Sequence, residues 1–404
     1  MWLFRLGFVF AAYLLMNIYT GIRVLGALKY FFPSSRAFIF WPLYILFCYS
    51  FMLVMFLRFD KALFLRPAGQ FSLPFFAYFF FALIVLDALR LILRQLNVFP
   101  TAPGLSVLCT AIALGIAVFF MVYGSFHARN IHTVHYDINL SKNASGHLPQ
   151  LSATVPSAAK PSGLRIALIS DTHIGVTVGL KWIANIVDAV NKTEPDIIFI
   201  AGDIFDNDID AVRDLEGVAH ELRRLRAPLG VFASQGNHDV DRISLGATIR
   251  GEATADRIQE FLKDAGIVYL LDEVFLVADS FYVLGRRDVS PIGSRHTRKT
   301  AAELAAGLDK SRPLIFLDHQ PVDFPAIEAA GADLILSGHT HRGQIFPGRI
   351  VTRQMFKEAG ATHYGYWQGR SAQGVVTSGA GVWGPPMRIG SRSEVAVIDI
   401  QFGN

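Results

Sequence analysis

The chain has 404 residues, more than one domain usually holds, so we expect two structural units. Hydrophobic residues make up 52% and charged residues 17% of the chain. The mean hydropathy of +0.38 is high for a water-soluble protein. The net charge of +4 comes without a basic run interleaved with aromatics, so no nucleic-acid partner is expected. Cys48 and Cys109 lie in apolar stretches and offer neither a disulfide framework nor a thiolate metal site.

Residues 1–126 contain four apolar stretches that are long enough to cross a bilayer, which takes about 20 helical residues. These stretches are residues 6–22, 37–57, 71–93 and 104–126. We therefore predict a transmembrane domain of about four helices in a multi-pass protein of the cell membrane. The first stretch resembles a signal peptide, but no small-residue cleavage site follows it. Basic residues are balanced between the first two loops, which leaves the side of the membrane open.

The third apolar stretch contains an ionisable pair, Asp87 and Arg90. Residues three apart lie on one face of a helix, so the two side chains can reach each other. Ionisable residues within a membrane often carry function. The alternative is a mutually satisfied pair near the end of the helix.

Beyond residue 127 the sequence has the pattern of an α/β domain. Apolar runs of strand length occur at residues 164–170, 196–202, 229–235, 313–319 and 333–339, with helical segments such as 180–191 and 211–226 between them. Such runs alternating with helices predict a largely parallel sheet that is buried on both faces. Residues 132–140 read as a strand and 141–162 as an exposed loop. We therefore expect a connecting strand and linker at 127–163, and the α/β domain at 164–404.

Polar side chains follow all five apolar runs. They are Asp171-Thr172-His173, Gly202 to Asp206 (GDIFD), Gly236-Asn237-His238-Asp239, Asp318-His319 and Gly338-His339-Thr340-His341. Ligands of open α/β sheets bind at the carboxyl ends of strands, where these side chains would meet. Asp and His are ligands suited to Mn, Zn or Fe, and a carboxylate can bridge two such ions. We expect the glycines before Asp203, Asn237 and His339 to permit sharp turns.

In this order the five clusters resemble the calcineurin-like metallophosphoesterase family, over roughly residues 130–400. GHTHRGQIFPG (338–348) and SGAGVWGPPMRIG (378–390) are most similar to its membrane-associated bacterial branch. The resemblance implies a four-layer α/β/β/α sandwich with two divalent metal ions. It also implies hydrolysis of a phosphoester or pyrophosphate by a metal-bridging hydroxide. The resemblance implies a phosphorylated small-molecule substrate or a lipid-linked one, and a site kept beside a bilayer suggests the lipid-linked substrate.

The resemblance also assigns roles to the matching residues. One metal ion would be held by Asp171, His173 and His341, and the other by Asn237, His319 and His339, with Asp203 bridging both. His238 would protonate or stabilise the leaving-group oxygen. Asp206 would orient His238, although it could instead cap the following helix. Asp239 is a second candidate for orienting an imidazole.

Three arginines have two interpretations each. Arg286 and Arg287 follow a strand and could contact phosphate or lie in a solvated loop. Arg342 stands where related sequences more often have glycine, and its guanidinium could bind a phosphate or point to solvent.

Two other classes of function are weighed against the enzyme. The first is a membrane sensor or scaffold that binds a phosphorylated ligand without turnover. A missing metal ligand or a missing His238 would mark such a protein, and neither is missing. The second is a transporter-like helical bundle, which predicts polar residues along the bundle. The apolar stretches offer few beyond Asp87 and Arg90.

Overall fold

The computed structural model describes residues 2–56, 66–96, 103–142, 163–206, 209–239, 251–290 and 297–403. Contacts divide the chain into two compact units, Met1–Phe126 and His127–Asn404. Each unit has a hydrophobic core of its own. Most of the loop expected at residues 141–162 lies outside the described residues.

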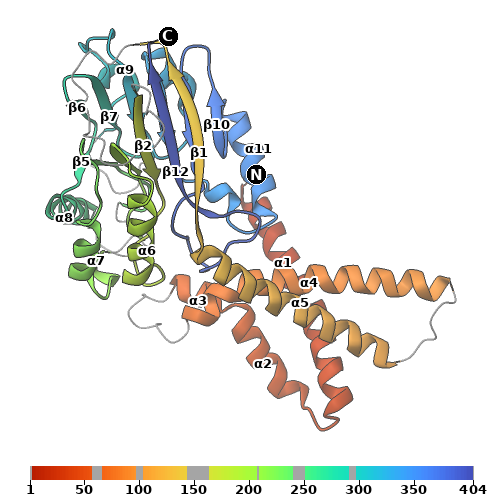
Figure 1. The fold of residues 1–404 in the computed structure, drawn as a ribbon. Helices are drawn as coiled ribbons and strands as arrows, with labels where there is room; N and C mark the ends of the chain where they lie inside the picture. The colour runs from red at the N-terminus through yellow and green to blue at the C-terminus, as the bar shows by residue number, and fades with distance from the viewer. Residues whose placement is uncertain are drawn as a thin grey trace. The chain divides into compact units, whose positions relative to one another are not determined.

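The described part of the first unit is helical (Figure 1). Its helices are α1 (Trp2–Phe31), α2 (Ala37–Cys48), α3 (Ser50–Phe56), α4 (Arg66–Gln95) and α5 (Pro103–Arg129), the last turn of which enters the second unit. Three segments are long and apolar enough to cross a membrane: Phe10–Phe31, Ala68–Gln95 and Gly104–Arg129.

The stretch at 37–57, expected to be a fourth span, is not one continuous helix. The helix breaks at Tyr49, whose φ of −100° and ψ of 6° leave the helical region. Tyr13 in α1 gives a physical reason, because its hydroxyl donates a 2.7 Å hydrogen bond to the Cys48 carbonyl. That carbonyl no longer takes part in a continuous helical ladder. The expected count of about four membrane-length helices is therefore three within the described residues.

Asp87 has a closer partner than the Arg90 that the sequence suggested. Arg23 in α1 donates to both carboxylate oxygens of Asp87, at 3.0 and 2.9 Å. Arg90 lies 3.7 Å away, and the Tyr19 hydroxyl also donates to Asp87. The charge is thus satisfied mainly across two helices rather than along one, which ties α1 to α4.

The described strands of the second unit form two six-stranded sheets. The first sheet has the order β1 (Ile131–Leu140), β12 (Ser393–Phe402), β2 (Gly163–Ile169), β3 (Ile197–Ala201), β4 (Val231–Ser234), β5 (Val268–Leu270). The second has the order β10 (Gly365–Gln368), β11 (Gln373–Val376), β9 (Leu334–Ser337), β8 (Leu314–Leu317), β7 (Phe281–Gly285), β6 (Glu273–Val277). Strands β2 to β5 run parallel, as do β7, β8, β9 and β11.

Three hydrophobic clusters separate four layers. In β2, Ile166 and Leu168 face the core between the sheets, while Ala167 and Ile169 face a second core under α6 (Leu180–Asn191), α7 (Leu215–Leu222) and α8 (Gly251–Asp264). A third core lies between the second sheet and the helices α9 (Ala301–Leu304) and α10 (Phe324–Ala329). Successive side chains of a strand point to opposite faces, so strands buried on both sides read as continuous apolar runs. The predicted α/β/β/α sandwich is confirmed.

One element differs from the local sequence pattern, and another has a pairing partner far away in the sequence. The helix expected at 211–226 is shorter, because Asp214 caps α7 by accepting a hydrogen bond from the Gly217 amide. The strand expected at 132–140 is β1, which pairs in parallel with β12 at the edge of the first sheet. A further helix, α11 (Gly348–Glu358), follows the 3-10 turn His341–Gly343.

Candidate metal centre

The predicted ligands follow the carboxyl ends of five strands. Asp171 and His173 follow β2, Asp203 follows β3, Asn237 follows β4, His319 follows β8, and His339 and His341 follow β9. Strands β2, β3 and β4 are parallel neighbours in the first sheet, and β8 and β9 are parallel neighbours in the second. The seven side chains therefore collect at the strand ends, as expected for open α/β sheets.

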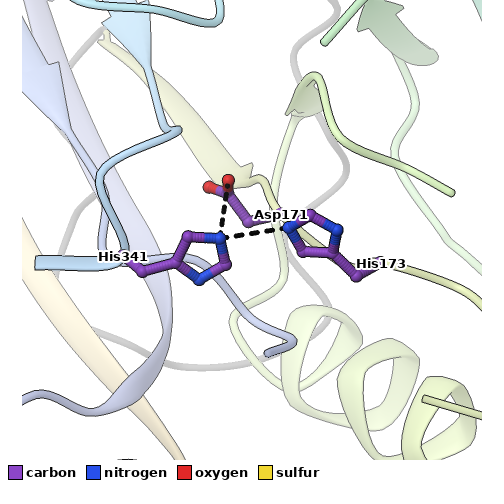
Figure 2. Close-up of side chains that lie close together, drawn as sticks. All are labelled: Asp171, His173 and His341. Carbon is purple, nitrogen blue, oxygen red and sulfur yellow. Dashed lines mark hydrogen bonds and ion pairs between the residues drawn. The ribbon is translucent and has the colours of Figure 1, made fainter. Parts of the chain in front are cut away.

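Asp171, His173 and His341 form the first group of ligand atoms (Figure 2). Nε2 of His341 lies 3.1 Å from Nε2 of His173 and 3.3 Å from Oδ1 of Asp171. All three residues are buried. Two imidazole nitrogens and a carboxylate oxygen aimed at one point are a donor set that suits a divalent cation.

Asp203, His319 and His339 form the second group. Nδ1 of His319 is 2.7 Å from the Ala201 carbonyl oxygen, to which it can only donate. Nε2 of His319 then keeps its lone pair, and it lies 3.1 Å from Oδ2 of Asp203. Two acceptors this close require a proton or a cation between them. Oδ2 of Asp203 is also 3.6 Å from Nε2 of His173, so Asp203 lies between the two groups.

Orphaned acceptors test whether these residues fit metal ions. Within the described chain, Oδ1 of Asn237 and Nε2 of His319 are buried and have no hydrogen-bond partner. A buried acceptor without a partner costs about 1–3 kcal/mol. Both residues are predicted ligands of the same ion, and a bound cation would satisfy both atoms. The donor set therefore fits two divalent cations.

His238 and Asp206 lie beside the ligand groups. Nδ1 of His238 is 3.7 Å from Oδ1 of Asp206, which is itself 4.0 Å from Nδ1 of His173. The His238 amide donates to Oδ1 of Asp203 at 2.7 Å, which fixes its backbone to the centre. The Trp383 ring packs edge-on against the His238 ring, with centroids 5.9 Å apart. The imidazole therefore has a carboxylate on one side and an aromatic wall on another.

The backbone around the centre is strained. Five predicted ligands have positive φ, namely Asp171 (53°), His173 (46°), Asp203 (51°), His339 (69°) and His341 (47°). Non-glycine residues in this left-handed region cost about 1–3 kcal/mol each and cluster at functional sites. Such conformations turn each side chain sharply at a strand end, which is how the groups converge.

Two of the three positions require glycine because another loop packs closely against them, rather than because the chain turns there. Gly202 has a φ of +75°, as a turn requires, whereas Gly236 and Gly338 do not have positive φ. A Cβ at Gly236 would overlap the backbone and carboxylate of Asp203, and one at Gly338 would overlap Asp171. The expectation that all three permit sharp turns is therefore corrected for these two.

Burial sets the protonation of the first group. It lowers the pKa of His173 to about 3 and shifts the pKa of His341 in the same direction. Both imidazoles are therefore neutral at pH 7, which is the form that binds a metal ion. Burial also raises the pKa of Asp171 to about 6.

Asp239 organises loops rather than an imidazole. Its carboxylate accepts hydrogen bonds from the backbone amides of Ile204 and Phe205, at 2.8 and 2.9 Å, and of Gly236, at 2.8 Å. It thereby joins the loop that follows β3 to the loop that follows β4. Burial raises its pKa to about 7.

Arg388 was missed by the sequence reasoning. It is fully buried, and its guanidinium donates to the carbonyls of Ser378 (2.7 Å), Gly381 (2.8 Å) and His341 (3.3 Å). Burial lowers its pKa to about 10, so it remains charged at pH 7. Arg388 fixes the backbone that carries His341. The segment MRIG gave no sign of a buried cation, since single arginines are usually exposed.

The three arginines with open interpretations now have positions. Arg286 is buried, with Nη1 2.6 Å from Asp318 and 3.2 Å from Asp323, so it acts in a buried ion-pair network. Arg287 pairs with Asp272 at 3.8 Å. Arg342 stacks over the Tyr364 ring, with its guanidinium carbon 4.1 Å from the centroid.

Residues 164–343 match the family model described as calcineurin-like phosphoesterase. The match contains every predicted ligand. This segment is a calcineurin-like phosphoesterase domain. The resemblance of the five clusters is thereby confirmed.

Relatives of the domain occur in proteins of different lengths. An uncharacterised metallophosphoesterase of Campylobacter jejuni is 26% identical over 238 residues, which is 59% of each chain. A transmembrane protein with metallophosphoesterase domain from Danio rerio is 32% identical, over 59% of this chain and 53% of its own. An uncharacterised metallophosphoesterase of Aquifex aeolicus is 28% identical, over 61% of this chain and 90% of its own. The chain thus spans little more than half of the first two relatives.

Proposed function

We propose that the protein is a membrane-anchored phosphoesterase that uses two divalent cations to hydrolyse a phosphoester or pyrophosphate. The observation that carries the proposal is the convergence of six His and Asp side chains from four strand ends into two groups, with Asp203 of the second group 3.6 Å from His173 of the first. Membrane anchoring is supported by three helices long and apolar enough to cross a bilayer.

The proposed roles follow from the two groups. Asp171, His173 and His341 would hold one cation, Asn237, His319 and His339 the other, and Asp203 would contact both. When bound, the two cations lower the pKa of water and withdraw charge from the phosphoryl oxygens. The oxygen and imidazole ligands accept Mn, Zn or Fe.

His238 would act on the leaving group. His173, Asp203 and His238 form a third group of atoms close enough to hold a metal ion, but the ligand sets assigned above do not include His238. A carboxylate near Nδ1 favours the proton on that nitrogen and stabilises the imidazolium, which can donate from Nε2. Asp206 supplies this carboxylate at 3.7 Å. We therefore assign general-acid help to His238 and its orientation to Asp206.

A phosphorylated compound that resides in the bilayer is the proposed substrate class. The support is that the membrane-length helices and the domain belong to one chain. Membrane helices in the same chain would keep the catalytic site close to lipid, where the effective concentration of a lipid-linked phosphate is high. A soluble phosphorylated molecule is the alternative, and comparing turnover of a phospholipid in mixed micelles with turnover of a soluble phosphate ester decides between them.

Turnover by purified full-length protein tests the proposal. The protein is stripped of metal in detergent, reloaded with Mn²⁺ or Zn²⁺, and assayed on bis-p-nitrophenyl phosphate and p-nitrophenyl phosphate. We expect metal-dependent turnover that is lost in Asp203→Asn and kept in Asp137→Asn, whose carboxylate is exposed on β1. Two metal ions bound per chain without turnover of either ester would instead favour a sensor that binds a phosphorylated ligand.

A further inference from the structure

Helix α11 exposes an apolar arc. Ile350, Val351 and Met355 are 60%, 59% and 58% exposed, more than any other large apolar side chain in the described second unit. At about 100° per residue these three side chains span roughly 140° of the helix surface, and the hydrogen-bonded pair Gln354 and Glu358 lies within that span. Phe356 points the other way and is buried, with its ring centroid 6.1 Å from that of His339. One side of α11 thus packs on the metal centre, and another side is bare.

A basic stripe runs beside the apolar arc. Arg349, Arg353 and Lys357 are spaced four apart, so they line one side of the helix. Among the described residues, none of the three has a carboxylate partner. Glu358, the acid of this helix, accepts a hydrogen bond from Gln354 at 2.6 Å.

The stripe continues toward the centre. Arg342, Arg349 and Arg353 all lie near His363, and burial together with these three charges lowers its pKa. The His363 carbonyl in turn accepts a hydrogen bond from the hydroxyl of Thr340, between the predicted ligands His339 and His341. Unpaired cations thus extend from α11 to the loop that carries two of the predicted ligands.

This combination fits an anionic lipid surface better than a soluble partner. A helix with bulky apolar residues on one face and Lys or Arg beside it lies in the interface plane of a bilayer. Each basic residue near an anionic leaflet adds attraction to the lipid headgroups. The same chain contains three segments that can cross a membrane, which would keep a bilayer within reach of the second unit.

We propose that α11 is an interfacial helix that seats the domain on anionic lipid. Ile350, Val351 and Met355 enter the boundary between headgroups and acyl chains, and the basic stripe contacts headgroup phosphates. The proposal rests on the membrane anchoring proposed above and specifies how the site meets lipid. The helix begins five residues after Gly343, so docking would bring the loop of His339 and His341 to the lipid surface.

Lipid-dependent quenching at α11 tests the docking. Full-length protein with Cys48→Ala and Cys109→Ala receives Val351→Cys, carries an environment-sensitive fluorophore there, and is placed in nanodiscs. The discs contain phosphatidylcholine with or without phosphatidylglycerol, and lipid spin-labelled near the headgroup as quencher. A matched variant carries the fluorophore at Lys310→Cys, an exposed polar position. We expect roughly threefold or greater quenching at 351, stronger with phosphatidylglycerol, and little at 310.

Three outcomes would overturn the proposal. The first is a label at 351 that stays accessible to water in both kinds of disc. The second is a label that is shielded from water in detergent and insensitive to spin-labelled lipid, which means that protein covers α11. The third is unchanged dependence on phosphatidylglycerol in the triple variant Arg349→Gln, Arg353→Gln and Lys357→Gln. Metal content and turnover of p-nitrophenyl esters are measured on the same samples, so loss of the proposed activity is seen separately.

Discussion

At the scale of single residues, the centre combines strained predicted ligands with one imidazole, that of His238, that the proposed ligand sets leave out. His238 is held by its backbone on Asp203 and by its ring against His173 and Trp383. A general acid matters most when the leaving group is a poor one, because a good leaving group departs without a proton. The two possible roles of His238, ligand and acid, therefore predict different outcomes when it is replaced.

We predict that His238→Gln lowers kcat by roughly 10²–10⁴-fold on an alkyl phosphate ester and much less on p-nitrophenyl phosphate. Metal content should not change, as measured by mass spectrometry of the metals. His220→Gln is the matched control, because the His220 side chain is 73% exposed on α7. Loss of a metal ion in His238→Gln would show instead that this imidazole is a ligand.

Proton competition should shape metal affinity through two predicted ligands, Asp171 and His319. Metal binds the deprotonated ligands, so a proton held by a ligand must leave first. Burial raises the pKa of Asp171 to about 6, and the Asp203 carboxylate outweighs burial and raises the pKa of His319 well above its ordinary value. Affinity should therefore already fall as the pH drops from about 8 to 6, and by roughly a further tenfold per pH unit below that. His173, with its pKa lowered to about 3, should not compete in this range.

Equilibrium dialysis of Mn²⁺ against the metal-free protein between about pH 5 and 8 measures this dependence. Asp137→Asn serves as the control for general charge effects, because Asp137 is exposed. Affinity that stays flat down to pH 6 and falls only below it would show that His319 holds no competing proton and contradict the prediction.

The sequence could predict the site residues but not how they are held. Asp, Asn and His at the ends of five strands are chemically distinctive, so the sequence predicts all seven ligands. Their left-handed backbone depends on contacts between loops and has no local signature. Arg388 is invisible for the same reason, since its partners are carbonyls of Ser378, Gly381 and His341. Asp239 was noticed, but as an imidazole partner rather than an acceptor of backbone amides.

At the scale of elements, glycines let the loops of the two sheets touch. A side chain at Gly338 would overlap Ser170 and Asp171, so the loop after β9 could not close on the end of β2. The His339 amide donates to the Asp171 carboxylate at 3.1 Å, a contact that depends on this closure. Groups that orient metal ligands typically change affinity by roughly 10–100-fold when they are lost.

Gly338→Ala should therefore lower metal affinity by roughly 10–100-fold, with loss first from the group of Asp171. Gly179→Ala is the matched control, because nothing lies within 4 Å of a Cβ there. Because Gly179 is the N-cap of α6, a position where glycine is preferred over alanine, this control should cost up to about 1 kcal/mol of stability without changing metal affinity. Metal titration and urea unfolding of both variants check this, and equal affinity in the two would refute the close-packing argument.

The sequence predicts those strands and helices whose hydrophobic pattern lies within a short stretch of the chain. Each of the five apolar runs contains a strand, because alternate faces of β2, β3, β4, β8 and β9 all meet apolar cores. The break between α2 and α3 depends on Tyr13, which lies in another helix. The parallel pairing of β1 with β12 joins strands far apart in sequence. Neither long-range contact leaves a trace in a window of neighbouring residues.

At the scale of the whole molecule, the two units have separate hydrophobic cores, and only the second unit contains predicted metal ligands. The first unit packs Phe76, Phe79 and Leu83 of α4 with Ala113 and Ala117 of α5. The predicted ligands all belong to the second unit. Units with separate cores can unfold in separate steps, so a single free energy of unfolding need not describe the chain.

We predict two thermal transitions for the detergent-solubilised protein, only one of which responds to metal. An ion at a concentration of 100 Kd stabilises the state that binds it by about 2.7 kcal/mol per site. Adding Mn²⁺ to the metal-free protein should therefore raise the Tm of the second unit and leave that of the first unchanged. Scanning calorimetry separates the two, with Asp203→Asn as the variant that should lose the shift. A single transition that moves as a whole with Mn²⁺ would show instead that the membrane-length helices and the phosphoesterase domain unfold as one cooperative body.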